Sequence, residues 1–204
     1  MTTIISSLFI SLDGVAEIDP AWHFPYYDEH MGAAVTEDYE GTDVLVLGRV
    51  TYDSFAGAWP DRETAGDVDA SFAKQLGDTR KLVATRGDQE LGWRNAERTD
   101  DLLSAVAALR GQPGVNKVLV AGSISVVRQL LAAGLLDELR LLVHPVAARH
   151  GERLFGDADQ PQPLKLIRSA IFPTGVVQLV YAPAEFPSEA TYADAADKLA
   201  GADG

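Results

Sequence analysis

The sequence predicts an α/β fold of three layers, in which helices flank a mostly parallel central sheet and an antiparallel hairpin forms the C-terminal end. Two unbroken apolar runs, Val44–Leu47 and Val118–Ala121, have the character of strands covered on both faces, as parallel strands are. Each run is followed by a glycine and a helix-like pattern, which begins a β-α-β unit. The turn at Pro173-Thr174-Gly175 separates two β-like segments, which is typical of a hairpin.

The composition narrows the classes of protein to which the chain can belong. It has 204 residues, 47% of them apolar, which suits one domain over residues 1–182, and the net charge of −13 argues against a nucleic-acid or anionic-membrane surface. There is no cysteine, so disulfides, thiolate metal sites and cysteine nucleophiles are excluded. The chain begins without a basic leader and no apolar run reaches the roughly 18 residues of a membrane span, so we expect a cytoplasmic protein.

The first half of the chain is predicted to alternate strands with helices and loops. Its first strand is more apolar than simple alternation requires, so we expect it near the centre of the sheet. Expected strands are 4–12, 44–47 and 81–85, expected helices lie between Asp28 and Asp38 and at 50–55 and 71–76, and expected loops are an aromatic segment at 17–28 and an acidic one at 61–70.

The second half has the clearest β-α-β pattern. Asp100 and Asp101 are suited to cap a helix whose apolar residues follow the 3.6-residue period, and Gly111 with Pro113 ends it. Ser123 is expected to cap the next helix, which Gly134 terminates. The expected elements are a helix at 102–109, strands at 117–121 and 139–143, the hairpin strands at 163–172 and 176–181, and an acidic tail at 183–204.

The segment around Gly48 is the first candidate binding site. Gly48 lets the backbone turn without a Cβ, and the N–H groups at the start of the following helix point toward whatever lies above the strand. Arg49 adds a guanidinium suited to phosphate. A second such unit, with Gly122 and Ser123, gives the pair that a dinucleotide lying across a parallel sheet requires. The alternative is a tight turn at Gly48 with a solvated Arg49.

Two carboxylates are candidate proton donors, and an aromatic loop is a candidate substrate wall. Asp13 follows the first strand at the sheet edge where α/β proteins bind ligands, although Asp-Gly is also an ordinary turn. Asp28 follows the aromatic loop, although it also suits a helix cap. Trp22 and Tyr26 offer flat apolar surfaces for a ring-shaped substrate, and we add Tyr52, which is expected to face inward from its helix.

Several chemistries are absent from the sequence. It contains no G-x-S-x-G, G-x-x-x-x-G-K-[ST], H-E-x-x-H or G-x-G-x-x-G motif. The four histidines have no short ligand spacing, so no metal site is expected. Hydride transfer needs little from the protein beyond a cofactor site, a flat pocket and one proton donor, which matches what remains.

These segments together resemble the dihydrofolate reductase-like superfamily, and specifically the C-terminal reductase domain of the riboflavin-biosynthesis deaminase/reductase in its free-standing form. The resemblance covers residues 4–182 in the order of the family. It rests on Ser11-Leu12-Asp13-Gly14, on Leu47-Gly48-Arg49-Val50-Thr51-Tyr52 with Trp59-Pro60, on Ala121-Gly122-Ser123, on the run Leu130–Leu141, and on Pro145 with Gly151-Glu152-Arg153-Leu154-Phe155.

The resemblance implies NADPH as cofactor and a homodimer. The chain also departs from the family pattern in two places. Ser123 stands where members often have a second glycine, and Ala147–His150 replaces a glycine-rich turn. Thr85 and Arg86 would lie near the adenosine. The phosphates would be held by Gly48, Arg49, Thr51, Gly122, Ser123, Ile124 and Ser125.

The leading hypothesis is therefore an NADPH-dependent reductase of a small heterocyclic or carbonyl compound, without a metal, nucleic-acid or membrane partner. The proton would come from Asp13, Asp28 or water. The rival hypothesis is a protein that binds NADPH as a sensor or interaction module and has no turnover.

Overall fold

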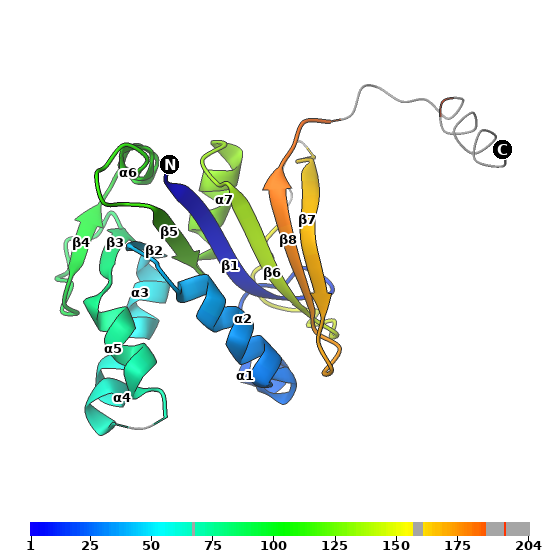
Figure 1. Ribbon diagram of the computed structural model, residues 1–204, viewed down its shortest axis with the longest axis horizontal. Coiled ribbons are helices and arrows are strands. Elements are labelled where there is room, and N and C mark those ends of the chain that lie inside the picture. Colours follow the sequence, from blue (N-terminus) through cyan, green and yellow to red (C-terminus); the bar gives the residue numbers. More distant parts are fainter. Residues whose placement is uncertain (67, 157–160, 187–193, 195–204) are drawn as a thin grey trace.

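An eight-stranded sheet with the order β4-β3-β2-β5-β1-β6-β8-β7 organises the chain in the computed structural model (Figure 1). The structure describes residues 1–66, 68–156, 161–186 and 194, so most of the predicted acidic tail lies outside the described residues. The strands are β1 (Thr3–Ser11), β2 (Val44–Gly48), β3 (Arg80–Ala84), β4 (Ala96–Thr99), β5 (Lys117–Ala121), β6 (Glu138–His144), β7 (Leu164–Ile171) and β8 (Val177–Pro183).

Helices cover both faces of this sheet and give the three predicted layers. One face is packed by two helices from the second half of the chain, and the opposite face by helices from the first half (Figure 1). The helices are α1 (Pro20–His23), the 3-10 turn η1 (Phe24–Tyr26), α2 (Glu29–Tyr39), α3 (Arg49–Ala56), α4 (Trp59–Ala65), α5 (Ala70–Asp78), α6 (Leu102–Leu109) and α7 (Ile124–Ala132).

The strand pairing confirms the predicted fold class. β1 pairs in parallel with β5 and β6, and β2 pairs in parallel with β5 and β3. β8 runs antiparallel between β6 and β7, which is the predicted C-terminal hairpin. β1 is central, as its apolar run predicts, and each side of it contributes to a separate core. The parallel arrangement places the ends of β1, β2, β3, β5 and β6 on one edge of the sheet.

Three local predictions are wrong, and each error has a physical cause. The stretch 61–70 was expected to be a loop, but α4 occupies its first half, beginning with Pro60 in its first turn and ending at Gly66 with φ of +69°. The aromatic loop contains α1 and η1, with Asp19 capping α1 through the N–H of Ala21. β4 was not predicted, because an edge strand with exposed central residues has little apolar signal.

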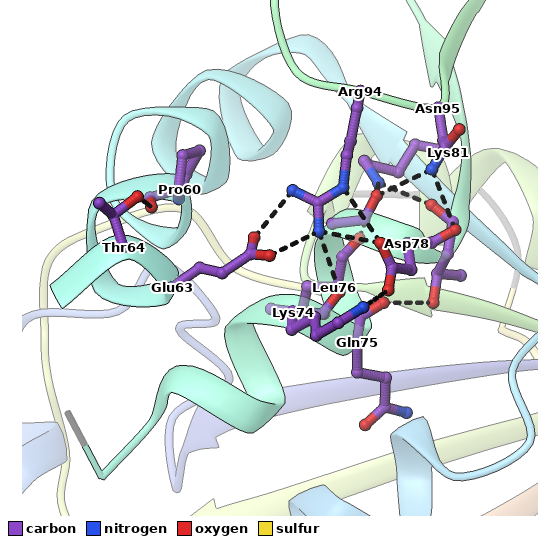
Figure 2. Close-up of polar contacts among 12 residues, drawn as sticks. Pro60, Glu63, Thr64, Lys74, Gln75, Leu76, Asp78, Lys81, Arg94 and Asn95 are labelled. Atoms are coloured by element: carbon purple, nitrogen blue, oxygen red, sulfur yellow. Dashed lines mark hydrogen bonds and ion pairs between the residues drawn. The ribbon is translucent and has the colours of Figure 1, made fainter. Parts of the chain in front are cut away.

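A buried lysine joins the end of α5 to β3 and to the connection that leads into β4 (Figure 2). Lys81 is fully buried, and its Nζ donates to the carbonyl oxygens of Leu76 at 2.7 Å, Gly77 at 3.0 Å and Thr79 at 2.6 Å. The same ammonium lies 4.2 Å from the centre of the Trp93 ring. Because the last carbonyls of a helix have no partners within it, Lys81 adds donors to a helix end that Thr79 already caps through its N–H to the Gln75 carbonyl oxygen.

An arginine ties α4 and α5 to the same connection. Arg94 binds both carboxylate oxygens of Glu63, at 2.8 and 3.0 Å, and its Nη2 lies 3.0 Å from Asp78 Oδ1 (Figure 2). Burial, with Arg94 as a secondary cause, lowers the pKa of Lys81 to about 8. These contacts fix the α4–α5 pair against β3, whose far end carries Thr85 and Arg86.

Candidate nucleotide-binding site

The two strand-glycine-helix units lie side by side, because β2 and β5 are neighbours in the sheet. Val46 is in register with Val120, so Gly48 and Gly122 end adjacent strands at the same level. A Cβ on Gly122 would lie 3.5 Å from the Cγ2 atom of Thr51, which shows how closely α3 approaches the second turn. The two turns that the sequence pairs are therefore neighbours at this edge.

The N-termini of α3 and α7 both face this edge without a side-chain cap. Neither N-cap residue, Gly48 for α3 or Ser123 for α7, accepts a hydrogen bond from the first turn through a side chain. The first N–H groups of a helix have no carbonyl partner within it, and the helix dipole places partial positive charge there. The N–H groups of Thr51 in α3 and of Ile124 and Ser125 in α7 therefore belong to two first turns that can bind one anion together.

Ser123 does not cap α7, which corrects the prediction from the sequence. Its backbone has φ of +55°, the left-handed region that favours glycine, and its hydroxyl turns toward β2. Ser123 Oγ accepts a hydrogen bond from the Gly48 N–H at 2.8 Å. A Cβ on Gly48 would lie 3.4 Å from Val126 Cγ2 and 3.6 Å from Ser123 Oγ, which are ordinary contact distances, so this hydrogen bond does not by itself require a glycine.

Arg49 is the first residue of α3 and already has an acidic partner. Its Nε donates to both carboxylate oxygens of Asp53, at 2.9 and 2.8 Å, and its Nη1 lies 3.4 Å from the Gln89 carbonyl oxygen. The hydrogen bond with Asp53 raises the pKa of Arg49 above its ordinary value. The guanidinium therefore lies along α3 toward Asp53, one turn after the start of the helix.

The end of β3 supplies the other residues expected near a nucleotide. Thr85 continues the pairing with β4 through its N–H and the Thr99 carbonyl at 3.0 Å, and its hydroxyl accepts from the Gly87 N–H at 3.1 Å. Arg86 is exposed, and no acceptor of the described residues lies within hydrogen-bond distance of its guanidinium. The sheet order places this end beside Gly48, so Arg49 and Arg86 flank the same edge.

Asp13 lies at the same edge but has a structural role that argues against proton donation. Its carboxylate accepts from Ser11 Oγ at 2.6 Å and from the N–H groups of Ala148 at 2.9 Å and Arg149 at 2.9 Å. These bonds, that of Ser11 first, lower the pKa of Asp13 to about 2. A carboxyl group with this pKa is ionised at neutral pH and holds the segment after β6 in place.

Asp28 caps α2, which is the alternative that the sequence left open for it. Its side chain accepts from the Met31 N–H at 2.9 Å, and its second oxygen lies 3.4 Å from His30 Nδ1. The carboxylate is about one-fifth exposed, so a solvent-borne group can still reach it. Its proposed role as a proton donor stays a prediction.

The aromatic segment surrounds two histidines that the sequence did not connect. Trp22 is buried with its ring 5.0 Å from that of His144, and the Tyr26 ring lies 5.9 Å from His144. His23 Nδ1 lies 3.2 Å from His144 Nε2, and His144 Nδ1 lies 3.0 Å from the Leu142 carbonyl oxygen. A carbonyl can only accept, so His144 carries its proton on Nδ1 and accepts from His23. No sequence spacing could reveal a pair that only the fold brings together.

Tyr52 is a core residue rather than an open substrate contact. Only 2% of its surface is exposed, and its hydroxyl accepts from the Trp93 N–H at 2.9 Å. It lies at the wall of an open hollow of about 590 Å³ beside α3, which Asp53 and Glu90 also line. The tyrosine therefore fixes the connection before β4 against α3.

The histidine pair predicts a stability that depends on pH. Burial lowers the pKa of His23 to about 4 and also lowers that of His144, whereas an unfolded histidine titrates near 6.5. The unfolded chain then binds more protons between these values, so stability is complete above about pH 6.5 and is lost as the pH falls toward 4, by about 2 to 3 kcal/mol. Urea titrations of wild type and His23→Phe should show a steeper acid slope for wild type, and His30→Gln should behave as wild type. Equal slopes in wild type and His23→Phe would contradict the assignment.

Two kinds of site are not found in the part of the chain that the structure describes. No three residues among its histidines, aspartates and glutamates are grouped so that they could hold a metal ion. None of its helices is both long and apolar enough to cross a lipid bilayer.

Comparison with known proteins agrees with the fold. The protein resembles a putative riboflavin biosynthesis protein from Shewanella sp. PV-4 with a TM-score of 0.69 and 19% identity, over 90% of this chain and all of that one. A pyrimidine reductase-like protein from Corynebacterium diphtheriae gives a TM-score of 0.64 at 18% identity, over 91% and 93% of the two chains. Acinetobacter baumannii RibD gives 0.61 at 15% identity, with 91% of this chain matching 59% of that chain.

The fold is the dihydrofolate reductase-like α/β fold that the sequence predicts. The family model described as the RibD C-terminal domain matches residues 2–178. YyaP of Bacillus subtilis (strain 168), described as uncharacterized, is 31% identical over 183 residues, which cover 87% of this chain and 93% of that protein. The chain belongs to the RibD C-terminal domain family.

Proposed function

We propose that the protein is an NADPH-dependent reductase that acts on a C=N or C=O group of a small heterocyclic compound. The observation that carries the proposal is the pair of uncapped helix N-termini at the ends of β2 and β5, with Arg49 beside them. Family membership and the pyrimidine reductase-like description of one structural neighbour support the reaction class.

The residues at this edge offer N–H groups and a guanidinium, which are groups suited to a dinucleotide phosphate. Gly48 and Gly122 keep the strand ends free of side chains, and the first turns of α3 and α7 supply N–H donors through Thr51, Ile124 and Ser125. Arg49 would meet a phosphate, while Thr85 and Arg86 would lie on the adenosine side. NADPH, when bound, supplies the hydride.

The protein's own part in the reaction is to position the substrate and to provide a proton. Asp13 is ionised and fully engaged, so we assign the proton to Asp28 or to water that reaches the edge. Trp22 is buried against the histidine pair, whereas Tyr26 is only partly buried and would present its outer surface to a ring. Hydride and proton together convert the double bond to its reduced form.

Nucleotide titration tests this function directly. Calorimetry with NADPH should show saturable binding, and NADPH should raise the melting temperature equally with and without a chelator, because a ligand of the folded state alone adds stability. Oxidation of NADPH should then be followed with a panel of pteridines, folates, pyrimidine ribityl compounds and quinones. Absence of NADPH binding, or a thermal shift that the chelator abolishes, would contradict the proposal.

A second candidate function is NADPH binding without turnover, as in a sensor. It is favoured by the state of the two candidate acids, because Asp13 has a strongly lowered pKa and Asp28 caps α2. Saturable NADPH binding with no oxidation across the whole panel would support this function over the reductase.

We also propose that two copies associate through the edge strand β7. Three of its apolar side chains, Leu166, Ile167 and Ile171, are at least half exposed, and an exposed apolar edge favours pairing with a second strand. Light scattering at micromolar concentration should give twice the chain mass, and the chain mass would contradict it. The cytoplasmic location, with a small molecule as the other partner, is proposed on the family match alone.

A further inference from the structure

The phosphate-facing groups of the β2–α3 turn already have acceptors from the chain itself. Asp53 lies one turn after Arg49 on α3, and both of its oxygens are within 2.9 Å of Arg49 Nε. The Gly48 N–H likewise donates a hydrogen bond to Ser123 Oγ at 2.8 Å. Two donors expected to meet an anion are therefore paired within the chain, Arg49 with a carboxylate and the Gly48 N–H with a hydroxyl oxygen.

We propose that Asp53 is an internal competitor for the cofactor phosphate at Arg49 and thereby sets the affinity for NADPH. The proposal rests on the proposed function, because it assigns Arg49 to a phosphate. Binding of the phosphate requires the Arg49 guanidinium to leave or share Asp53, and the remaining carboxylate repels the phosphate. In a chain of net charge −13, this acid is the one placed directly on the arginine of the turn.

If Asp53 instead positioned Arg49 for the phosphate, it would raise the affinity for NADPH. The geometry argues against that role. The Asp53 side chain is half exposed and that of Arg49 is a quarter exposed, so their ion pair is a surface pair four residues apart. Such a pair favours the paired conformation of the arginine side chain over unpaired ones by only about twofold. A carboxylate directly beside a bound phosphate repels it at a few ångströms, where salt screens little, and we expect this repulsion to exceed the restraint.

Asp53→Asn separates the charge from the contact. Asparagine keeps an oxygen that can accept from Arg49 Nε, while the negative charge is removed. We expect the NADPH dissociation constant to fall about three- to tenfold, and the gain to disappear in Arg49→Ala, as competition for that arginine requires. Asp61→Asn makes the same charge change on an exposed acid of α4 and should leave affinity within twofold of wild type.

Inorganic pyrophosphate provides an arm that does not depend on the cofactor assignment. We expect Asp53→Asn to bind pyrophosphate more tightly than wild type, and this gain should vanish when Arg49→Ala is added. That result would support the competition even if wild type failed to bind NADPH and the proposed function were wrong. Unchanged or weaker binding of both probes by Asp53→Asn, or an equal gain in Asp61→Asn, would overturn the inference. Circular dichroism of each variant checks that the helices are retained.

Discussion

Replacing Lys81 with methionine is expected to lower the free energy of unfolding by about 2 to 4 kcal/mol, because it removes a buried ammonium that donates to three carbonyl oxygens at the end of α5. The stem of methionine fills most of the same space, but the carbonyls of Leu76, Gly77 and Thr79 lose their ammonium. The contact with the Trp93 ring is lost as well. Urea unfolding at pH 7, followed by circular dichroism, measures the change.

Lys74→Met is the matched control for this substitution. Lys74 is exposed on the same helix and forms an i,i+4 ion pair with Asp78, so its replacement should cost less than about 0.5 kcal/mol. If Lys81→Met and Lys74→Met lowered stability to the same small extent, the capping role of Lys81 would be disproved.

Arg49→Ala is expected to weaken the binding of NADPH by about 1.5 to 3 kcal/mol, which raises the dissociation constant about ten- to a hundredfold. NADH should lose less affinity if Arg49 meets the 2′-phosphate and as much if it meets the shared pyrophosphate. Folding should change little, since the arginine loses only an exposed pair with Asp53 and a long contact with the Gln89 carbonyl. Calorimetric titration of both nucleotides measures these outcomes.

Arg62→Ala removes the same charge from α4 and serves as the control. Arg62 is exposed and paired with Asp69, so its loss should leave both nucleotide affinities within about twofold. Unchanged affinity for both nucleotides in Arg49→Ala would leave Gly48-Arg49 as a plain turn and remove the strongest support for the cofactor.

Elements with a local signal could be predicted from the sequence. The apolar runs at β2 and β5 show that both strands are buried on both faces, and Asp101 caps α6 through the Ser104 N–H, as its position predicts. The hairpin follows from Gly175, whose φ of +86° lets the chain turn between β7 and β8. In each case the residues that determine the structure are neighbours in the chain.

The remaining features depend on contacts between residues far apart in the chain. The proximity of His23 to His144 and of Ser123 to Gly48 follows from the strand order, which no local pattern specifies. Asp13 and Asp28 could be nominated from their places, but their roles as anchor and cap depend on which N–H groups surround them. The candidate site was predictable as a location at the sheet edge, whereas the state of each side chain was not.

The central place of β1 has a consequence for how the protein is made. β1 leaves the ribosome before the other strands of this sheet, yet its neighbours are β5 and β6, with Ile5 beside Leu119 and Ser11 beside His144. At translation rates of about 5 to 20 residues per second, this apolar strand waits roughly 5 to 25 seconds for its partners. During that interval its unpaired edges can join other chains. Nascent chains arrested before residue 117 should therefore depend on chaperones far more than chains released after residue 144.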